Sequence, residues 1–289
     1  MTVWKYLIRF KDASGRVLFG EAGGPSKAEA LLGKTVLVYQ GTSPWDPNMK
    51  ATGESAVVKE LLSPMEDSSI IHCVGVNYKA HVQESGMNPP QYPLVFNKFP
   101  DSLAGPLEDI TIDTETKELD YEGELCAVIG KACKNLDKKP QENPLDYVIG
   151  YTVGNDVSSR DWQNQHTTGM QHGYSKGFDK FAPIGPCIVS TDVIPDPTKL
   201  YLKTWVNRDL RQKTATDDLL FDISTTIRHL TRGRTMRPGC IIMTGTPSGV
   251  GWFMKPTGLL KHGDVVEVEI DGIGTIKNRM VFDSETVKN

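Results

Sequence analysis

Two glutamates and an aspartate are the residues of this chain whose types and spacing most plainly permit chemistry. Glu122 and Glu124 stand two residues apart in the stretch 119–129, and Asp156 follows the apolar run 147–154. Because side chains alternate between the two faces of a strand, the glutamates would share a face. Like charges so close together cost free energy unless a cation lies between them. A solvated strand end would have the same pattern, so the stretch alone leaves both interpretations open.

Three carboxylates without a thiolate or a paired-histidine set favour a hard cation such as Mg²⁺ or Mn²⁺, or Ca²⁺, over zinc. Three protein ligands would leave coordination positions for water and a bidentate substrate. A Lewis-acid catalyst needs those positions, whereas a purely structural site would close them. Asp120 would lie on the same face of the strand, as a fourth acid, a neighbour of the ligands or an exposed residue.

A histidine beside a carboxylate supplies a candidate base. His81 and Glu84 lie three residues apart in 77–86, which predicts one or two helical turns, so they would share a helix face. A carboxylate orients the imidazole and raises its basicity, as a general base requires, although a surface ion pair has the same spacing. An anionic substrate would also need cationic and polar partners, and the candidates are Lys98, Arg160, Gln163 and Lys176. Each of these, taken alone, is also compatible with an exposed position.

The glycine-rich segment 244–251 (TGTPSGVG) is a second kind of candidate. It lacks the lysine and the spacing of a phosphate-binding P-loop, and it is not a dinucleotide-binding fingerprint. Such a turn can aim backbone N–H groups at a carboxylate, or it can be a tight turn with no ligand.

Composition excludes several classes of function. The 289 residues carry a net charge of −4 and no long basic run, so we expect neither a nucleic-acid partner nor a membrane partner. The first residues resemble neither a signal peptide nor a transit sequence. The five cysteines are scattered and form no CxxC pair, which is typical of free thiols in a reducing compartment. We therefore expect a cytoplasmic location, with the mitochondrial matrix left open.

Elements of strand type predominate. Residues 1–65 are expected to form a small β-rich domain, and residues 66–289 a larger catalytic domain, with a boundary near the Ser63-Pro64 pair. Helical periodicity is clearest over 217–233, whereas the insert 164–175 has no periodicity and predicts a mobile loop. The predicted fold class is mostly β with some α.

Six motifs in order resemble the fumarylacetoacetate hydrolase superfamily, especially its eukaryotic domain-containing members with a short N-terminal domain. The matching segments are 75–84, 94–98, 120–125, 154–163, 176–179 and 244–251. Phe99 stands where members of the family often have proline, and the insert with His166 and His172 has no counterpart in the family pattern. These departures leave the identity of the substrate open.

The resemblance implies a β-sandwich roll with a pseudo-barrel of strands, usually a homodimer. It implies that Glu122, Glu124 and Asp156 ligate Mg²⁺ or Mn²⁺, and that His81 and Glu84 form a dyad on a lid. Lys176 would stabilise an enolate, and Thr246 would contact the substrate carboxylate. Arg160 and Gln163 would hold substrate oxygens, and Lys98 is a further predicted substrate-binding residue.

The implied substrate is a 2-oxo acid with a second carbonyl or carboxylate at C4, and the shared step is a metal-stabilised enolate. Hydrolysis of an acylpyruvate or decarboxylation of oxaloacetate is the favoured outcome. Keto–enol tautomerisation of oxaloacetate, or a 2-hydroxymuconate-type isomerisation, is the alternative. Two further hypotheses are a catalytically idle metal-binding protein of this fold and an enzyme for a larger 1,3-dicarbonyl compound.

Overall fold

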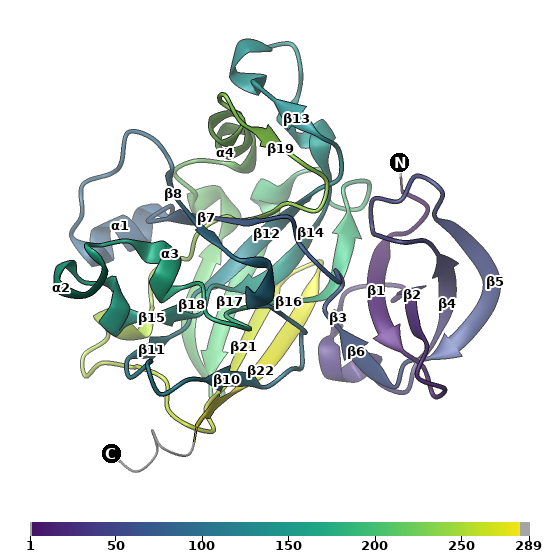
Figure 1. Cartoon of the computed structure of the whole chain (residues 1–289), viewed down its shortest axis with the longest axis horizontal. Coiled ribbons are helices and arrows are strands. Elements are labelled where there is room, and N and C mark those ends of the chain that lie inside the picture. The colour runs from purple at the N-terminus through teal and green to yellow at the C-terminus, as the bar shows by residue number, and fades with distance from the viewer. Residues whose placement is uncertain (1, 284–289) are drawn as a thin grey trace.

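The structure of the chain is a computed structural model that describes residues 2–283. Strands dominate and helices are few, which confirms the predicted fold class (Figure 1). The helices are α1 (Lys79–Ser85), α2 (Gln165–Thr168), α3 (His172–Ser175) and α4 (Ile223–Leu230). Short 3₁₀ helices that bear on the site are η5 (Arg160–Gln163), η7 (Thr216–Asp218) and η8 (Gly251–Phe253).

The strands pair mainly in antiparallel fashion. Those before the acidic stretch are β1 (Tyr6–Lys11), β2 (Val17–Glu21), β3 (Ser26–Lys27), β4 (Thr35–Gln40), β5 (Lys50–Val57), β6 (Glu60–Leu62), β7 (Ile71–Gly75), β8 (Leu94–Lys98), β9 (Leu103–Ala104) and β10 (Ile110–Ile112). Those that follow are β11 (Leu119–Asp120), β12 (Gly123–Ile129), β13 (Cys133–Lys134), β14 (Val148–Asn155), β15 (Ser158–Ser159), β16 (Ala182–Ser190), β17 (Tyr201–Val206), β18 (Asp209–Ala215), β19 (Thr235–Met236), β20 (Ile241–Met243), β21 (Val265–Ile270) and β22 (Gly274–Phe282).

Two sheets form the body of the described chain. The larger has the order β5-β4-β2-β1-β16-β14-β12-β20-β7-β8, and the smaller has the order β10-β22-β21-β17-β18. Strands β12, β14 and β16 of the larger sheet contact β17, β21 and β22 of the smaller one, so the two sheets pack as layers. Every residue of β12 is buried, which explains why its sequence is apolar on both faces.

The first sixty-five residues contribute strands to the larger sheet. β1 pairs with β16 through Tyr6 opposite Val189 and Leu7 opposite Ile188. The strands β1, β2, β4 and β5 therefore continue the sheet that holds β12 and β14 (Figure 1). The division of the chain at residue 65 stays a prediction.

The acidic stretch 119–129 is not one strand, which corrects the expectation that Asp120 shares a face with the two glutamates. β11 ends at Asp120 and pairs with β15, whereas β12 begins at Gly123 and pairs with β14. Between them Glu122 N donates to the side chain of Asn155 at 2.9 Å, and Glu122 O accepts from Asp156 N at 2.8 Å. These contacts interrupt the strand, so the alternation of side chains does not extend back to Asp120.

Two helical predictions also change. The helix predicted over 217–233 is α4, and it begins later, because the Asp222 side chain accepts a hydrogen bond from Thr225 N at 2.6 Å and caps the first turn. The insert predicted to be a loop contains the single turns α2 and α3. The Asn164 side chain caps α2 by accepting from His166 N at 2.9 Å, a local signal that periodicity does not detect.

Candidate active site

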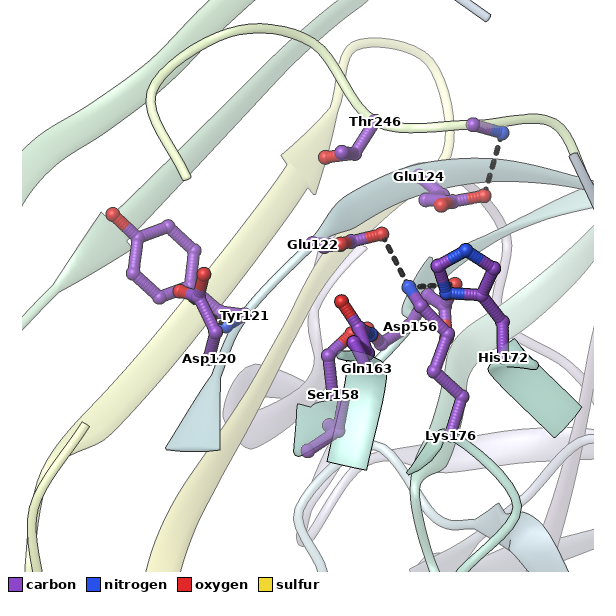
Figure 2. A network of polar contacts seen from close by, with 12 residues as sticks. Asp120, Tyr121, Glu122, Glu124, Asp156, Ser158, Gln163, His172, Lys176 and Thr246 are labelled. Carbon is purple, nitrogen blue, oxygen red and sulfur yellow. Dashed lines mark hydrogen bonds and ion pairs between the residues drawn. The ribbon is translucent and has the colours of Figure 1, made fainter. Parts of the chain in front are cut away.

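Glu122, Glu124 and Asp156 meet at one end of two paired strands. β12 and β14 are neighbours with Gly123 opposite Asn155, so the residues beside that pair come together. One oxygen atom of each carboxylate lies within 4.8 Å of the other two, and all three residues are buried. Figure 2 shows the three side chains in one cluster. The structure brings these predicted ligands together, and we call them the acidic triad.

Packing explains why the residue between the two glutamates is glycine. A Cβ atom at Gly123 would lie 2.2 Å from Thr204 Oγ1 on β17 and 3.0 Å from Val268 Cγ1 on β21. The first separation is far shorter than a van der Waals contact, so β12 can approach the smaller sheet this closely only with glycine here. The close approach of the sheets lies on the Gly123 face of β12, opposite to the face that carries the Glu124 side chain.

Lys176 and Arg160 each bridge two carboxylates of the site. Lys176 Nζ lies 2.7 Å from Glu122 Oε2 and 2.7 Å from Asp156 Oδ2 (Figure 2). Arg160 Nη2 lies 2.7 Å from Glu122 Oε1 and 2.8 Å from Asp120 Oδ2. Charge-assisted hydrogen bonds of this length are strong and fix the geometry of both partners.

Asp120 anchors Arg160 and the loop of η8, and it is not a member of the triad. Its side chain is fully buried, so the exposed alternative is wrong. Besides Arg160 Nε at 2.9 Å, its carboxylate accepts hydrogen bonds from Gly251 N at 2.8 Å and Trp252 N at 3.0 Å. Asp120 therefore joins the segment after the glycine-rich loop to the guanidinium that holds Glu122.

Lys98 lies on the far side of Asp156, at 2.7 Å from Oδ1, and its side chain is 0% exposed. Its ammonium group donates to the carbonyl oxygens of Val157 at 3.0 Å, Lys176 at 2.7 Å and Phe181 at 2.6 Å. An ammonium has three N–H bonds, and these acceptors take all of them. This arrangement differs from the substrate contact predicted for Lys98, because it leaves no donor for a ligand.

Burial and neighbouring charges shift the pKa of Glu122 in opposite directions, whereas both raise the pKa of Glu124. Burial raises the pKa of Glu122, but the charges of Lys176 and Arg160 outweigh burial and hold this pKa well below its usual range. Burial raises the pKa of Glu124 well above its usual range, and the other two carboxylates of the triad add to the rise. Glu124 is therefore the acid whose negative charge the protein compensates least.

The buried charges of the site do not balance. Counted as ionised, four buried carboxylates face two buried lysines and one arginine whose side chain is 11% exposed. These residues are Asp120, Glu122, Glu124, Asp156, Lys98, Lys176 and Arg160. A divalent cation on the triad would compensate the remaining negative charge and leave the site attractive to an anionic substrate. Carboxylate oxygens are also the donors that Mg²⁺ and Mn²⁺ prefer, so the residues present fit a hard divalent cation.

His81 and Glu84 form the predicted pair on α1, and the histidine is largely buried, unlike a surface ion pair. His81 Nδ1 lies 2.9 Å from Glu84 Oε2, and Glu84 Oε1 accepts a hydrogen bond from Gly249 N at 2.8 Å. Because an ionised carboxylate only accepts hydrogen bonds, Nδ1 carries a proton in this pair, and Nε2 offers a lone pair when the imidazole is neutral. The Phe253 ring lies 5.9 Å from the imidazole, so η8 also contacts the dyad.

Thr246 is buried in the glycine-rich loop. Its hydroxyl is held by Gln212, a residue that the sequence did not single out. Thr246 Oγ1 donates to Gly123 O at 3.0 Å and accepts from Gln212 Nε2 at 2.7 Å. Gln212 Oε1 also accepts from Gly123 N at 3.0 Å. Gln212 is 1% exposed, but most residues of β18 are polar, so the local sequence does not single it out.

The two histidines of the insert differ in position. His166 is exposed on α2, whereas His172 is partly buried on α3 and lies near the acidic triad in Figure 2. Gln163 Oε1 accepts a hydrogen bond from Arg160 Nη1 at 2.9 Å, as expected for residues one turn apart. Lys176, the residue that follows α3, is buried among the acids.

Residues 70–281 match the family described as fumarylacetoacetate (FAA) hydrolase, C-terminal. The chain belongs to this family. A Xenopus laevis protein named mitochondrial oxaloacetate tautomerase is 44% identical over 221 residues, which cover 76% of this chain and 68% of that protein. The predicted family is thereby confirmed.

Similar solved structures support the same family assignment. A 2-hydroxyhepta-2,4-diene-1,7-dioate isomerase from Mycobacterium marinum is 32% identical with a TM-score of 0.80, covering 97% of this chain and 99% of that one. A fumarylpyruvate hydrolase from Pseudomonas aeruginosa, solved with Mn²⁺ and pyruvate, is 30% identical with a TM-score of 0.66. The match covers 75% of this chain and 91% of that one. The chain is therefore an enzyme of this superfamily. None of the helices in residues 2–283 is long and apolar enough to cross a membrane.

Proposed function

We propose that this enzyme is a divalent-metal-dependent oxaloacetate tautomerase that works through an enolate. The observation that carries the proposal is a histidine that Glu84 orients through Nδ1, within electrostatic reach of Glu122 in an acidic triad whose charge is incompletely balanced. Interconversion of keto and enol forms needs one base and stabilisation of the enolate, and it breaks no carbon–carbon bond. The Xenopus laevis relative, named for this activity, supports the choice of oxaloacetate.

The acidic triad would hold the cation, which we propose to be Mg²⁺ or Mn²⁺. The Pseudomonas aeruginosa relative with bound Mn²⁺ supports this part of the proposal. When bound, the cation would supply Lewis-acid stabilisation of the negative charge that develops on the enolate.

Lys176 would add a fixed positive charge. Burial lowers the pKa of Lys176, but Asp156 and Glu122 outweigh burial and raise it, so the ammonium keeps its proton near neutral pH. Lys176 would therefore stabilise negative charge and not act as a base. Arg160 would hold Gln163 in place through their hydrogen bond, so that Gln163 can contact a substrate oxygen.

His81 would move the proton. In the keto-to-enol direction, His81 Nε2 takes a proton from C3 and the bonding electrons pass to the C2 oxygen. The C2 oxygen then receives a proton from water to give the enol, and the imidazolium returns its proton to water. Glu84 would stabilise the imidazolium through Nδ1 and keep the ring in one orientation. The bond from Gly249 N holds Glu84 in turn, so the glycine-rich loop supports the base. Thr246 would bind a substrate carboxylate by exchanging its bond to Gly123 O.

Hydrolysis or decarboxylation is a second candidate. The same Nε2 lone pair is suited to deprotonating a water molecule, which would attack the C4 carbonyl of an acylpyruvate. The Pseudomonas aeruginosa relative named fumarylpyruvate hydrolase favours this candidate. Loss of CO₂ from oxaloacetate would break the C3–C4 bond and leave the enolate of pyruvate, whose negative charge the same site would stabilise.

An assay on three compounds separates the candidates. Purified protein with Mg²⁺ is given enol-oxaloacetate, keto-oxaloacetate and acetylpyruvate, while ultraviolet absorbance follows the enol and a coupled dehydrogenase follows pyruvate. The proposal predicts fast enol loss without pyruvate release. Rapid pyruvate release from acetylpyruvate or oxaloacetate would instead establish hydrolysis or decarboxylation.

Two properties outside the site complete the proposal. We propose a homodimer, which light scattering on the purified protein would test. We also propose a mitochondrial location, because the Xenopus laevis relative is named mitochondrial, and cell fractionation would separate this from the expected cytoplasmic location.

A further inference from the structure

Four buried side-chain nitrogen atoms around the acidic triad have no hydrogen-bond partner within residues 2–283. Arg160 Nη2 is held in ion pairs with Asp120 and Glu122, and Asn155 Nδ2 belongs to a side chain whose Oδ1 accepts from Glu122 N. The other two are Gln163 Nε2 on η5 and His172 Nδ1 on α3. Buried polar atoms almost always have a partner in folded proteins, so two orphaned nitrogens in one region indicate a place where a ligand binds. His172 takes no part in the proposed proton transfer or in stabilising the enolate.

The spacing within α3 directs the His172 ring toward Lys176. The two residues lie four positions apart, and Lys176 N donates to His172 O at 3.1 Å, so their side chains share a helix face. The Phe96 ring lies 5.5 Å from the His172 ring and 5.0 Å from Lys176 Nζ. The imidazole and the ammonium therefore contact the same aromatic side chain, next to the triad (Figure 2).

Gln163 presents its amide nitrogen from a neighbouring element. Its Oε1 accepts from Arg160 Nη1 at 2.9 Å, which identifies Nε2, with its two N–H bonds, as the free end. η5 packs on α3, and the Trp162 and Tyr174 rings meet edge to face with centroids 5.0 Å apart. The two orphaned nitrogens thus belong to two elements held together by packing.

The chemistry of these two groups suits an oxygen ligand. Burial and the nearby Lys176 ammonium lower the pKa of His172, so the ring is neutral near pH 7 and its N–H is a neutral donor. An amide N–H and an imidazole N–H together fit a carboxylate or a carbonyl oxygen. In the proposed function, the cation, Lys176 and Thr246 serve the C1 and C2 end of the substrate, which leaves these donors for the other end.

We propose that His172, together with Gln163, binds the C4 carboxylate of a 2-oxo dicarboxylic acid and thereby selects dicarboxylates over shorter acids. This inference rests on the proposed function for the class of substrate. It assigns a specificity-determining contact to the insert, whose sequence does not fit the family pattern.

The test compares two probes that differ only beyond C3. Malate carries a C4 carboxylate and lactate does not, and their binding to the protein with Mg²⁺ is measured by titration calorimetry. H172F removes the donor, H172N replaces the ring N–H with an amide N–H, and H166F is the matched control on the exposed histidine of the same insert. H172L repeats the test if H172F does not fold.

A hydrogen bond to a charged group is worth about 1.5–3 kcal/mol, so H172F should weaken malate binding by about 10- to 150-fold. Lactate binding should change less than about two-fold, H172N should recover most of the malate affinity, and H166F should bind both probes like the wild type. Equal effects of H172F on malate and lactate, or no effect on either, would overturn the inference. If malate and lactate behave as expected but the wild type converts neither oxaloacetate nor acetylpyruvate, the proposed function fails and the carboxylate subsite stands.

Discussion

Replacing Lys98 by methionine tests whether this lysine holds the site together or contacts the substrate. Methionine has a similar volume, so the change removes the charge and the donors without opening a large cavity. The substitution leaves Asp156 without one of its two cations and removes the lysine donor from three buried carbonyl oxygens, of which Phe181 O keeps a hydrogen bond from Val157 N at 3.1 Å. A Lys98 that only contacted substrate would leave the free energy of unfolding unchanged.

The expected cost follows from those contacts. Removing one partner of a buried ion pair costs about 3–5 kcal/mol. Each carbonyl oxygen left unsatisfied adds about 1–3 kcal/mol, although contributions within one network are not additive. We therefore expect K98M to lose at least about 3 kcal/mol of the free energy of unfolding, measured by equilibrium urea denaturation with EDTA present so that metal binding does not contribute.

K180M is the matched control. Lys180 pairs with Glu108 at 2.9 Å, but their side chains are 36% and 43% exposed, so this substitution should cost under about 1 kcal/mol. A K98M protein as stable as K180M, with a raised KM and an unchanged kcat, would refute the positioning role. It would restore the substrate contact that the sequence predicts.

Three further outcomes follow from the site and its surroundings. His81→Ala should lower kcat by about 10²- to 10⁴-fold with little change in KM, and unchanged turnover on every substrate would favour the catalytically idle alternative. Mg²⁺ at about 100 times its Kd should stabilise the wild type by about 2.7 kcal/mol, which is measured as a rise in Tm. The E124Q variant should lose most of that rise. An equal rise in E124Q would show that Glu124 is not a metal ligand. Burial raises the pKa of Cys133 to about 11, so this thiol should carry little thiolate at pH 8. Alkylation at Cys133, followed by mass spectrometry, should be on the order of 10²-fold slower than for a free cysteine and should accelerate as pH rises, and fast labelling of the folded protein would contradict this.

The parts of the site that the sequence predicts are those governed by local periodicity. Glu122 and Glu124 are recognisable because two residues on a strand share a face, and Asp156 because it follows a buried strand. His81 and Glu84 are recognisable because they are separated by three residues in a helix. In each case the pattern depends on neighbours within one element, so short-range rules suffice.

The parts that the sequence misses depend on partners far away in the chain. Asp120 binds Arg160, forty residues later, and Gly251 N, 131 residues later, and neither contact is visible in the alternation of 119–129. Gln212 reaches Gly123 across 89 positions. Lys98 looks like an exposed cation at the end of a strand until the fold places three carbonyl oxygens around it.

The central claim is that the acidic triad binds a divalent cation for enolate chemistry, and anomalous diffraction tests it most directly. Crystals would be soaked in Mn²⁺ with oxalate, and data collected on both sides of the manganese absorption edge. We predict one anomalous peak per chain, bonded to Glu122, Glu124 and Asp156 and to the oxalate oxygens. A triad without an anomalous peak, with Lys176 still bridging Glu122 and Asp156 and oxalate bound elsewhere, would contradict the account.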